Sequence, residues 1–149
     1  MIVWCKGDLF KRKVDIQINT VNCVGVMGKG IAKEFKKRYP DMYKDYKRAC
    51  RKKLLYVGTL DIWDDAKIQI INFPTKIDWK DKSRYEYIEK GLLELRTYLK
   101  NFGEIRVAMP ALGCNNGGLK WKIVKKMIRK HLKGLKARIY VYQPMEEWT

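Results

Sequence analysis

The sequence predicts a three-layer α/β/α domain with a mixed, largely parallel central sheet. Short apolar runs rich in β-branched residues alternate with amphipathic stretches of helical spacing along the 149 residues. Such alternation is typical of a sheet covered by helices on both faces. Two glycine-bearing segments, at 19–32 and 110–121, each follow such a run and lead into a helical pattern. No repeat or linker interrupts the pattern, so we expect one domain over residues 1–149.

In the first half of the chain, the helical pattern at 30–37 places Ile31, Ala32 and Phe35 on one face. The helix ends at Tyr39 because a proline follows, and the residue before a proline avoids the helical region. The strands expected here are 2–4, 15–18 (ending at Asn19), 56–63 and 67–73, and the helices are 30–37 and 41–51.

In the second half, Ser83 and Glu86 have the spacing of a capping box, which predicts the start of a helix. Leucines and isoleucine at helical spacing continue that helix, and we expect it to end near Gly103. The remaining elements expected are strands at 105–109 and 138–142 and a helix at 121–133.

The formal net charge is +17, and the basic residues are unevenly distributed. Residues 105–145 contain ten Lys or Arg and no Asp or Glu, and residues 29–53 form a second basic stretch. A field of this sign concentrates polyanions, which favours a nucleic-acid partner. A generally basic, solvated surface is the alternative.

The composition also indicates where the protein works. No apolar stretch approaches the ~20 residues that span a bilayer, and the first residues lack the pattern of a signal peptide. We therefore expect an intracellular, cytoplasmic protein without a membrane partner. The four cysteines form no C-x-x-C pair and the chain has a single histidine, so we expect free thiols, no metal site and no cofactor. Cys114 could act as a nucleophile, but packing is favoured because no histidine lies nearby in sequence.

The two glycine segments suit an anion. A strand that ends in glycines and opens a helix presents backbone N–H groups and a helix N-terminus, and both attract phosphates. Neither segment matches a P-loop or a dinucleotide fingerprint, since Gly28-Lys29-Gly30 lacks the required third glycine. From the glycines alone, a phosphate site and plain tight turns remain equal alternatives.

Three motifs occur in a fixed order: NTVNCVGVMGKGIA, then NFPTK, then PALGCNNGGLKW. Together they resemble the macrodomains, and within that family they are most similar to the DNA ADP-ribosyl glycohydrolase antitoxins of the DarG type. A related branch removes terminal ADP-ribose from protein carboxylates. The resemblance covers residues 7–144 and implies an ADP-ribose cleft on top of the sheet. Because such antitoxins carry a further toxin-binding domain, a cognate ADP-ribosyltransferase toxin is an implied partner.

The resemblance also implies roles for individual residues. Asp8 matches the acid that accepts from the adenine amino group, Asn19 and Asn22 match the asparagines at the distal ribose, and the glycine loops match the diphosphate site. Tyr142 to Pro144, at the end of the last strand, match the region that flanks the adenine, where Tyr142 could stack on the base or point into the core. The ligand-binding residues implied are Asp8, Leu9, Asn19, Gly28, Lys29, Gly30, Ile31, Pro110, Ala111, Leu112, Gly113, Cys114, Asn115, Asn116, Gly117, Gly118, Leu119, Tyr142 and Gln143.

Lys76 matches the lysine needed for hydrolysis in the DarG-type branch, and Asn22 is its expected catalytic partner. A neutral amine could attack the anomeric carbon, and a charged one could stabilise the leaving group. Two positions depart from the family pattern. Gly117 stands where protein-directed relatives carry an acid, which favours a DNA substrate, and Asn115 stands where glycine is usual.

We therefore expect an ADP-ribosyl hydrolase that removes mono-ADP-ribose from a nucleobase in DNA, with single-stranded DNA as the partner. The basic stretches at 120–136 and 47–53 are expected to follow the DNA backbone. Trp79 could stack on a base or pack in the core. The alternatives are an ADP-ribose 1″-phosphate phosphatase and a reader that binds ADP-ribose without hydrolysis.

Overall fold

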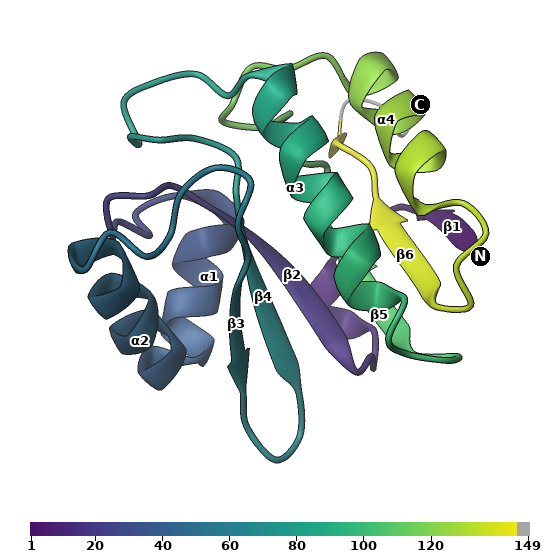
Figure 1. Ribbon diagram of the computed structural model, residues 1–149, viewed down its shortest axis with the longest axis horizontal. Coiled ribbons are helices and arrows are strands. Elements are labelled where there is room, and N and C mark those ends of the chain that lie inside the picture. Colours follow the sequence, from purple (N-terminus) through teal and green to yellow (C-terminus); the bar gives the residue numbers. More distant parts are fainter. Residues whose placement is uncertain (146–149) are drawn as a thin grey trace.

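The computed structural model describes residues 1–145 and contains a six-stranded sheet with the order β1-β6-β5-β2-β4-β3 (Figure 1). Neighbouring strands are parallel except for β3 and β4, which form an antiparallel hairpin. The predicted mixed, largely parallel sheet is thus confirmed. The strands are β1 (Ile2–Cys5), β2 (Ile16–Val21), β3 (Asp61–Asp64), β4 (Gln69–Pro74), β5 (Arg106–Met109) and β6 (Arg138–Tyr142).

Helices cover both faces of the sheet, which gives the expected three layers (Figure 1). Alternate residues of β4 show the division: Ile70 packs in the core cluster under α1 and α2, and Ile71 packs in the cluster under α3 and α4. The helices are α1 (Gly30–Arg38), α2 (Pro40–Arg51), α3 (Tyr85–Leu99) and α4 (Trp121–Leu132), and a short 3-10 helix, η1, spans Leu9–Lys11.

Across the described residues, no helix combines the length and the apolar character that a membrane crossing requires.

Two predicted strands differ from the structure by more than two residues at one end, and the other strand bounds differ by two residues or fewer. The strand expected at 56–63 is wrong for its first half, because Gly58 adopts a φ of +95° and Thr59 donates its N–H to the Tyr56 carbonyl at 3.0 Å. That turn leaves Asp61–Asp64 as β3. Strand β2 continues to Val21, so Asn19 lies inside the strand and not at its end.

The predicted capping box does not form. Arg84 is the N-cap of α3, without a side-chain hydrogen bond, and Glu86 instead pairs with Arg84 at 3.0 Å. Ser83 is held away from the helix because its N–H donates to the carbonyl of Gly117 at 3.0 Å. The helix also ends earlier than expected, at Leu99.

Gly91 sets how closely α3 approaches the sheet. A Cβ at this position would lie 2.2 Å from Cζ of Phe73. We expect Gly91→Ala to destabilise the protein by about 1–3 kcal/mol through overpacking, although alanine is the better helix former by about 1 kcal/mol. Urea unfolding measures this loss, and Gly103→Ala is the control because nothing lies within 4 Å of its Cβ. Equal stability of the two variants would contradict the prediction.

Candidate functional site

A pocket of about 650 Å³ opens at the carboxyl ends of β2, β4 and β5. Three connections line it. The first loop (22–29) joins β2 to α1, the second loop (110–120) joins β5 to α4, and the third loop (75–84) joins β4 to α3. In open α/β sheets, ligands bind where such loops converge. The volume lies in the range of small-molecule and cofactor sites.

Asn22 holds the first loop in shape. Its Nδ2 donates to the carbonyl of Val26 at 2.7 Å, and its Oδ1 accepts from the N–H groups of Val24 at 3.1 Å and Val26 at 3.3 Å. The hydroxyl of Tyr46 donates to both Oδ1 and the main-chain oxygen of Asn22, each at 2.8 Å. Burial raises the pKa of Tyr46, so the hydroxyl stays a donor. The Asn22 side chain therefore fixes the conformation of the first loop.

Cys23 joins the first loop to the third loop. Its N–H donates to the carbonyl of Ile77 at 2.9 Å, and its thiol donates to the carbonyl of Lys76 at 3.5 Å. Burial, with a smaller contribution from neighbouring Cys50, raises the pKa of the Cys23 thiol to about 11.

This raised pKa predicts a loss of stability in alkali. The unfolded thiol ionises near its ordinary pKa of 9.0, and the folded thiol near 11. Stability from this group is therefore complete below pH 9 and falls as the pH rises toward 11. Because Cys23 is only partly buried, we expect a loss of about 1–2 kcal/mol. Urea unfolding from pH 8 to 11 under reducing conditions measures it. Cys23→Ala should flatten the pH dependence, and an unchanged slope would contradict this assignment.

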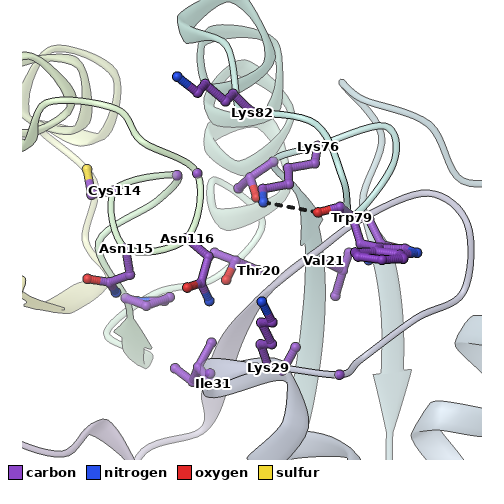
Figure 2. A pocket seen from close by; sticks show the side chains of 18 of the residues that line it. Thr20, Val21, Lys29, Ile31, Lys76, Trp79, Lys82, Cys114, Asn115 and Asn116 are labelled. Atoms are coloured by element: carbon purple, nitrogen blue, oxygen red, sulfur yellow. Dashed lines mark hydrogen bonds between the residues drawn. The ribbon is translucent and has the colours of Figure 1, made fainter.

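The third loop places a lysine amine over the pocket. The Nζ of Lys76 lies 3.5 Å from the carbonyl oxygen of Trp79 (Figure 2). The loop is anchored to β2, because the N–H of buried Thr75 donates to the carbonyl of Val21 at 2.9 Å. The amine thus faces the pocket from a backbone that is fixed to the sheet.

The second loop brings its backbone close to its neighbours. A Cβ on Gly117 would lie 2.2 Å from the Ser83 Oγ and 2.4 Å from the carbonyl oxygen of Gly113. A Cβ on Gly30 would lie 3.0 Å from the Asn116 Nδ2, so the first and second loops nearly touch. In the described part of the chain, no backbone N–H from 115 to 118 donates to another backbone group. These N–H groups remain for a ligand.

The electrostatics of the pocket suit an anion. The first N–H groups of a helix have no partner within that helix. Helix α1 begins at Gly30, and no side chain caps these groups. The charged side chains that line the pocket are four cations and one carboxylate, namely Lys29, Lys76, Lys80, Lys82 and Asp81. Backbone N–H groups, a helix N-terminus and excess positive charge together favour phosphate.

Most of the residues predicted for the site do line this pocket. They are Asn22, Gly28, Lys29, Gly30, Ile31, Lys76, Pro110, Ala111, Gly113, Cys114, Asn115, Asn116 and Gly117. The others do not line it: Asp8, Leu9, Asn19, Leu112, Gly118, Leu119, Tyr142 and Gln143.

Several of these exceptions are core residues. Asn19 is fully buried, and its Nδ2 donates to the Oδ1 of Asn72 at 3.0 Å, because β2 extends past it. Leu9 and Leu112 are buried in the two core clusters, and partly buried Leu119 packs against one of them. The prediction that Asn19 faces the ligand is therefore not met.

The residues expected around an adenine have other partners. The Asp8 carboxylate accepts from the N–H of Phe10 at 2.9 Å and caps η1. The Tyr142 hydroxyl accepts from the Arg12 Nε at 2.8 Å. Gln143 accepts from the Lys125 Nζ at 3.2 Å.

The pocket also contains residues to which sequence reasoning assigned no site role, apart from the possible base stacking of Trp79. Those at 20–32 lie inside the first motif, Thr75 lies inside the second motif, and residues 79–82 follow the second motif closely, so treating each motif and the residues after it as one segment would have found them. Trp79 is 51% exposed, which excludes the core position considered for it. The additional lining residues are Thr20, Val21, Val26, Ala32, Thr75, Trp79, Lys80, Asp81 and Lys82.

The fold and the site define an α/β/α protein with a pocket between glycine loops whose charge and backbone suit an anion. The chain belongs to the Macro domain family, which matches residues 18–128. It is 39% identical, over 98% of its length, to a protein named DNA ADP-ribosyl glycohydrolase from Thermus aquaticus, and it covers 42% of that protein.

Two solved structures extend the comparison. The macrodomain of Mycobacterium tuberculosis DarG superposes with a TM-score of 0.92 at 38% identity, covering 97% of this chain and 98% of that one. Thermosipho africanus DarTG in complex with ADP-ribose superposes with a TM-score of 0.90 at 34% identity, covering 99% of this chain and 43% of that one. The chain thus spans less than half the length of the Thermus aquaticus and Thermosipho africanus relatives.

Proposed function

We propose that this protein is an ADP-ribosyl hydrolase that removes mono-ADP-ribose from a nucleobase in single-stranded DNA. The observation that carries the proposal is the convergence of both glycine loops and Lys76 on one pocket. The names of the Thermus aquaticus and Thermosipho africanus relatives support the activity and the ligand. In this proposal the diphosphate lies between the N-terminus of α1 and the free N–H groups of the second loop.

Lys76 acts at the anomeric carbon. As a neutral amine it would form a bond to that carbon while the bond to the base breaks, and the base would leave with the proton that the amine loses. Opening of the ribose ring would turn this adduct into an imine, and water would hydrolyse the imine to release ADP-ribose and restore the lysine amine. As an ammonium it would instead stabilise negative charge on the departing base. Reduction with borohydride during turnover distinguishes the two roles, because only the amine attack gives an adduct on the protein.

Asn22 takes part as a positioning residue. It lines the pocket, but its donor and acceptor atoms are engaged with Val26 and Tyr46. We therefore assign it to the shape of the first loop around the distal ribose, and we assign no proton transfer to it.

A cationic stripe offers a path for the DNA backbone. It begins in the first turn of α4, directly after the second loop, and its residues are exposed. The stripe consists of Lys122, Lys126 and Arg129, which are spaced to share one side of α4, and of Lys133, which follows as the C-cap of that helix. Such a row attracts phosphates without reading sequence.

Salt dependence tests the stripe. We expect Lys122→Ala/Lys126→Ala to reduce the slope of log kcat/KM against log salt by about 1.4 for modified single-stranded DNA, at about 0.7 per lost phosphate contact. Affinity for free ADP-ribose should not change. Lys67→Ala/Lys100→Ala is the control, since both lysines are exposed at the end of the sheet away from the pocket. Equal slopes for the two double variants would refute the role of the stripe.

The proposed substrate implies an enzyme that makes it. The Thermosipho africanus relative is named a DNA ADP-ribosyl transferase-DNA ADP-ribosyl glycohydrolase fusion protein. We propose that the present chain likewise acts against a cognate ADP-ribosyltransferase.

Incubation with three substrates side by side tests the proposed function. We expect release of ADP-ribose from modified single-stranded DNA, and at least about tenfold less turnover of ADP-ribosylated protein and of ADP-ribose 1″-phosphate. For the protein substrate the reason is Gly117, which has no carboxylate and no space for a side chain. Preference for either other substrate, or tight ADP-ribose binding with no turnover at all, would overturn the proposal.

A further inference from the structure

Core packing does not explain the position of Trp79, because its ring is exposed at the pocket. The described residues include Trp4, Trp63, Trp79 and Trp121, and among these only Trp79 is exposed. Large aromatic side chains are usually buried, so an exposed one at a pocket is informative. Trp79 lines the pocket. Its exposed fraction of 51% leaves much of the ring available to a ligand.

The ring lies where the group leaving ADP-ribose would be. Figure 2 shows Cys114 and Asn115 of the second loop on one side of Lys76 and Trp79 on the other. The main-chain oxygen of Trp79 is 3.5 Å from the Lys76 Nζ. If the diphosphate lies at the second loop and the anomeric carbon at Lys76, the next group along the substrate is the base, and it reaches Trp79.

The surroundings of Trp79 suit a flat, apolar ring attached to an anionic chain. Val26 of the first loop, which is 38% exposed, lines the same pocket as Trp79. The Lys80 Nζ lies 5.9 Å from the centre of the Trp79 ring. Lys76 and Lys82 of the same loop also line the pocket and add to its positive charge. Aromatic faces next to cations are the usual platform for bases of single strands.

We propose that Trp79 is a stacking platform for the nucleobase that carries ADP-ribose, and that it sets the preference of the pocket for base-linked over protein-linked ADP-ribose. The inference rests on the proposed function and specifies its substrate contact. Trp79 is therefore a specificity residue, and it takes no part in bond breaking.

Kinetics on an ADP-ribosylated single-stranded oligonucleotide test this inference. We expect Trp79→Ala to lower kcat/KM by about 5-fold to 150-fold, the range found when one base loses an aromatic partner. Trp79→Phe should retain most of the wild-type value because it keeps a ring. Calorimetry should show unchanged affinity for free ADP-ribose, which has no base at the anomeric carbon. Tyr56→Ala is the matched control, an aromatic residue that is 60% exposed outside the pocket.

A binding measurement keeps the inference testable without turnover. In a Lys76→Ala background, Trp79→Ala should weaken binding of the modified oligonucleotide and leave binding of ADP-ribose unchanged. The inference is overturned if Trp79→Ala behaves like Tyr56→Ala, or if oligonucleotide and free ADP-ribose lose affinity equally. The proposed function fails separately if the wild-type protein releases no ADP-ribose from DNA, and the inference then falls with it.

Discussion

Lys76→Ala is expected to lose at least about 10²-fold in turnover of ADP-ribosylated DNA while it still binds ADP-ribose. Removing a group that acts in the transition state, through charge or proton transfer, typically has effects of this size. Binding should persist because the proposed diphosphate contacts come from backbone N–H groups of the second loop and the start of α1, which the substitution leaves in place. Single-turnover kinetics and calorimetry on the same preparation measure both quantities.

Two further variants sharpen the result. Lys76→Arg keeps the positive charge but cannot act as a neutral amine, so partial activity would indicate an electrostatic role and full loss would indicate nucleophilic attack. Lys67→Ala is the matched control, a lysine at the opposite end of the sheet in the hairpin between β3 and β4. Turnover of Lys76→Ala equal to that of Lys67→Ala would exclude Lys76 from the reaction.

Gly117→Ala is expected to lose both ADP-ribose affinity and stability. The added Cβ would lie 2.2 Å from the Ser83 Oγ and 2.4 Å from the carbonyl oxygen of Gly113, and the second of these atoms belongs to the backbone. The second loop must move, so its N–H groups no longer converge on the diphosphate. Losing one such charge-assisted hydrogen bond lowers affinity by about 10-fold to 100-fold, and the overpacking costs about 1–3 kcal/mol of stability.

The clash with the Gly113 carbonyl oxygen provides a control for the Gly117→Ala prediction. Removing the Ser83 hydroxyl should not rescue Gly117→Ala, because the contact with the Gly113 oxygen remains. Gly103→Ala should behave as wild type, since nothing lies within 4 Å of its Cβ. Calorimetric titration with ADP-ribose and urea unfolding measure the two effects. If Gly117→Ala binds ADP-ribose with wild-type affinity, the second loop does not hold the diphosphate in the conformation that the structure shows.

The sequence predicted the layers, the sheet type and most of the pocket because these depend on local signals. Helix α4 and strand β6 follow directly from hydrophobic periodicity. The glycine loops follow from the position of glycines at strand ends, and Lys76 follows from the resemblance of the NFPTK motif to the macrodomains.

The failures occur where tertiary contacts override local pattern. Ser83 has the spacing of a helix cap, but its N–H is already bonded to Gly117, a residue distant in sequence. Asn19 is of a residue type that is common in turns. Pairing with β4 nevertheless extends β2 past it, and its side-chain amide donates to Asn72. For Trp79, no periodicity distinguishes an exposed ring from a buried one. Only the packing of the third loop decides this.

A crystal structure of Lys76→Ala with ADP-ribose tests the central claim most directly. The account predicts the diphosphate within hydrogen-bond distance of the N–H groups of Gly30 and Gly117, and the anomeric carbon facing position 76. A ligand bound outside the glycine loops, or one whose anomeric carbon faces away from position 76, would contradict the account.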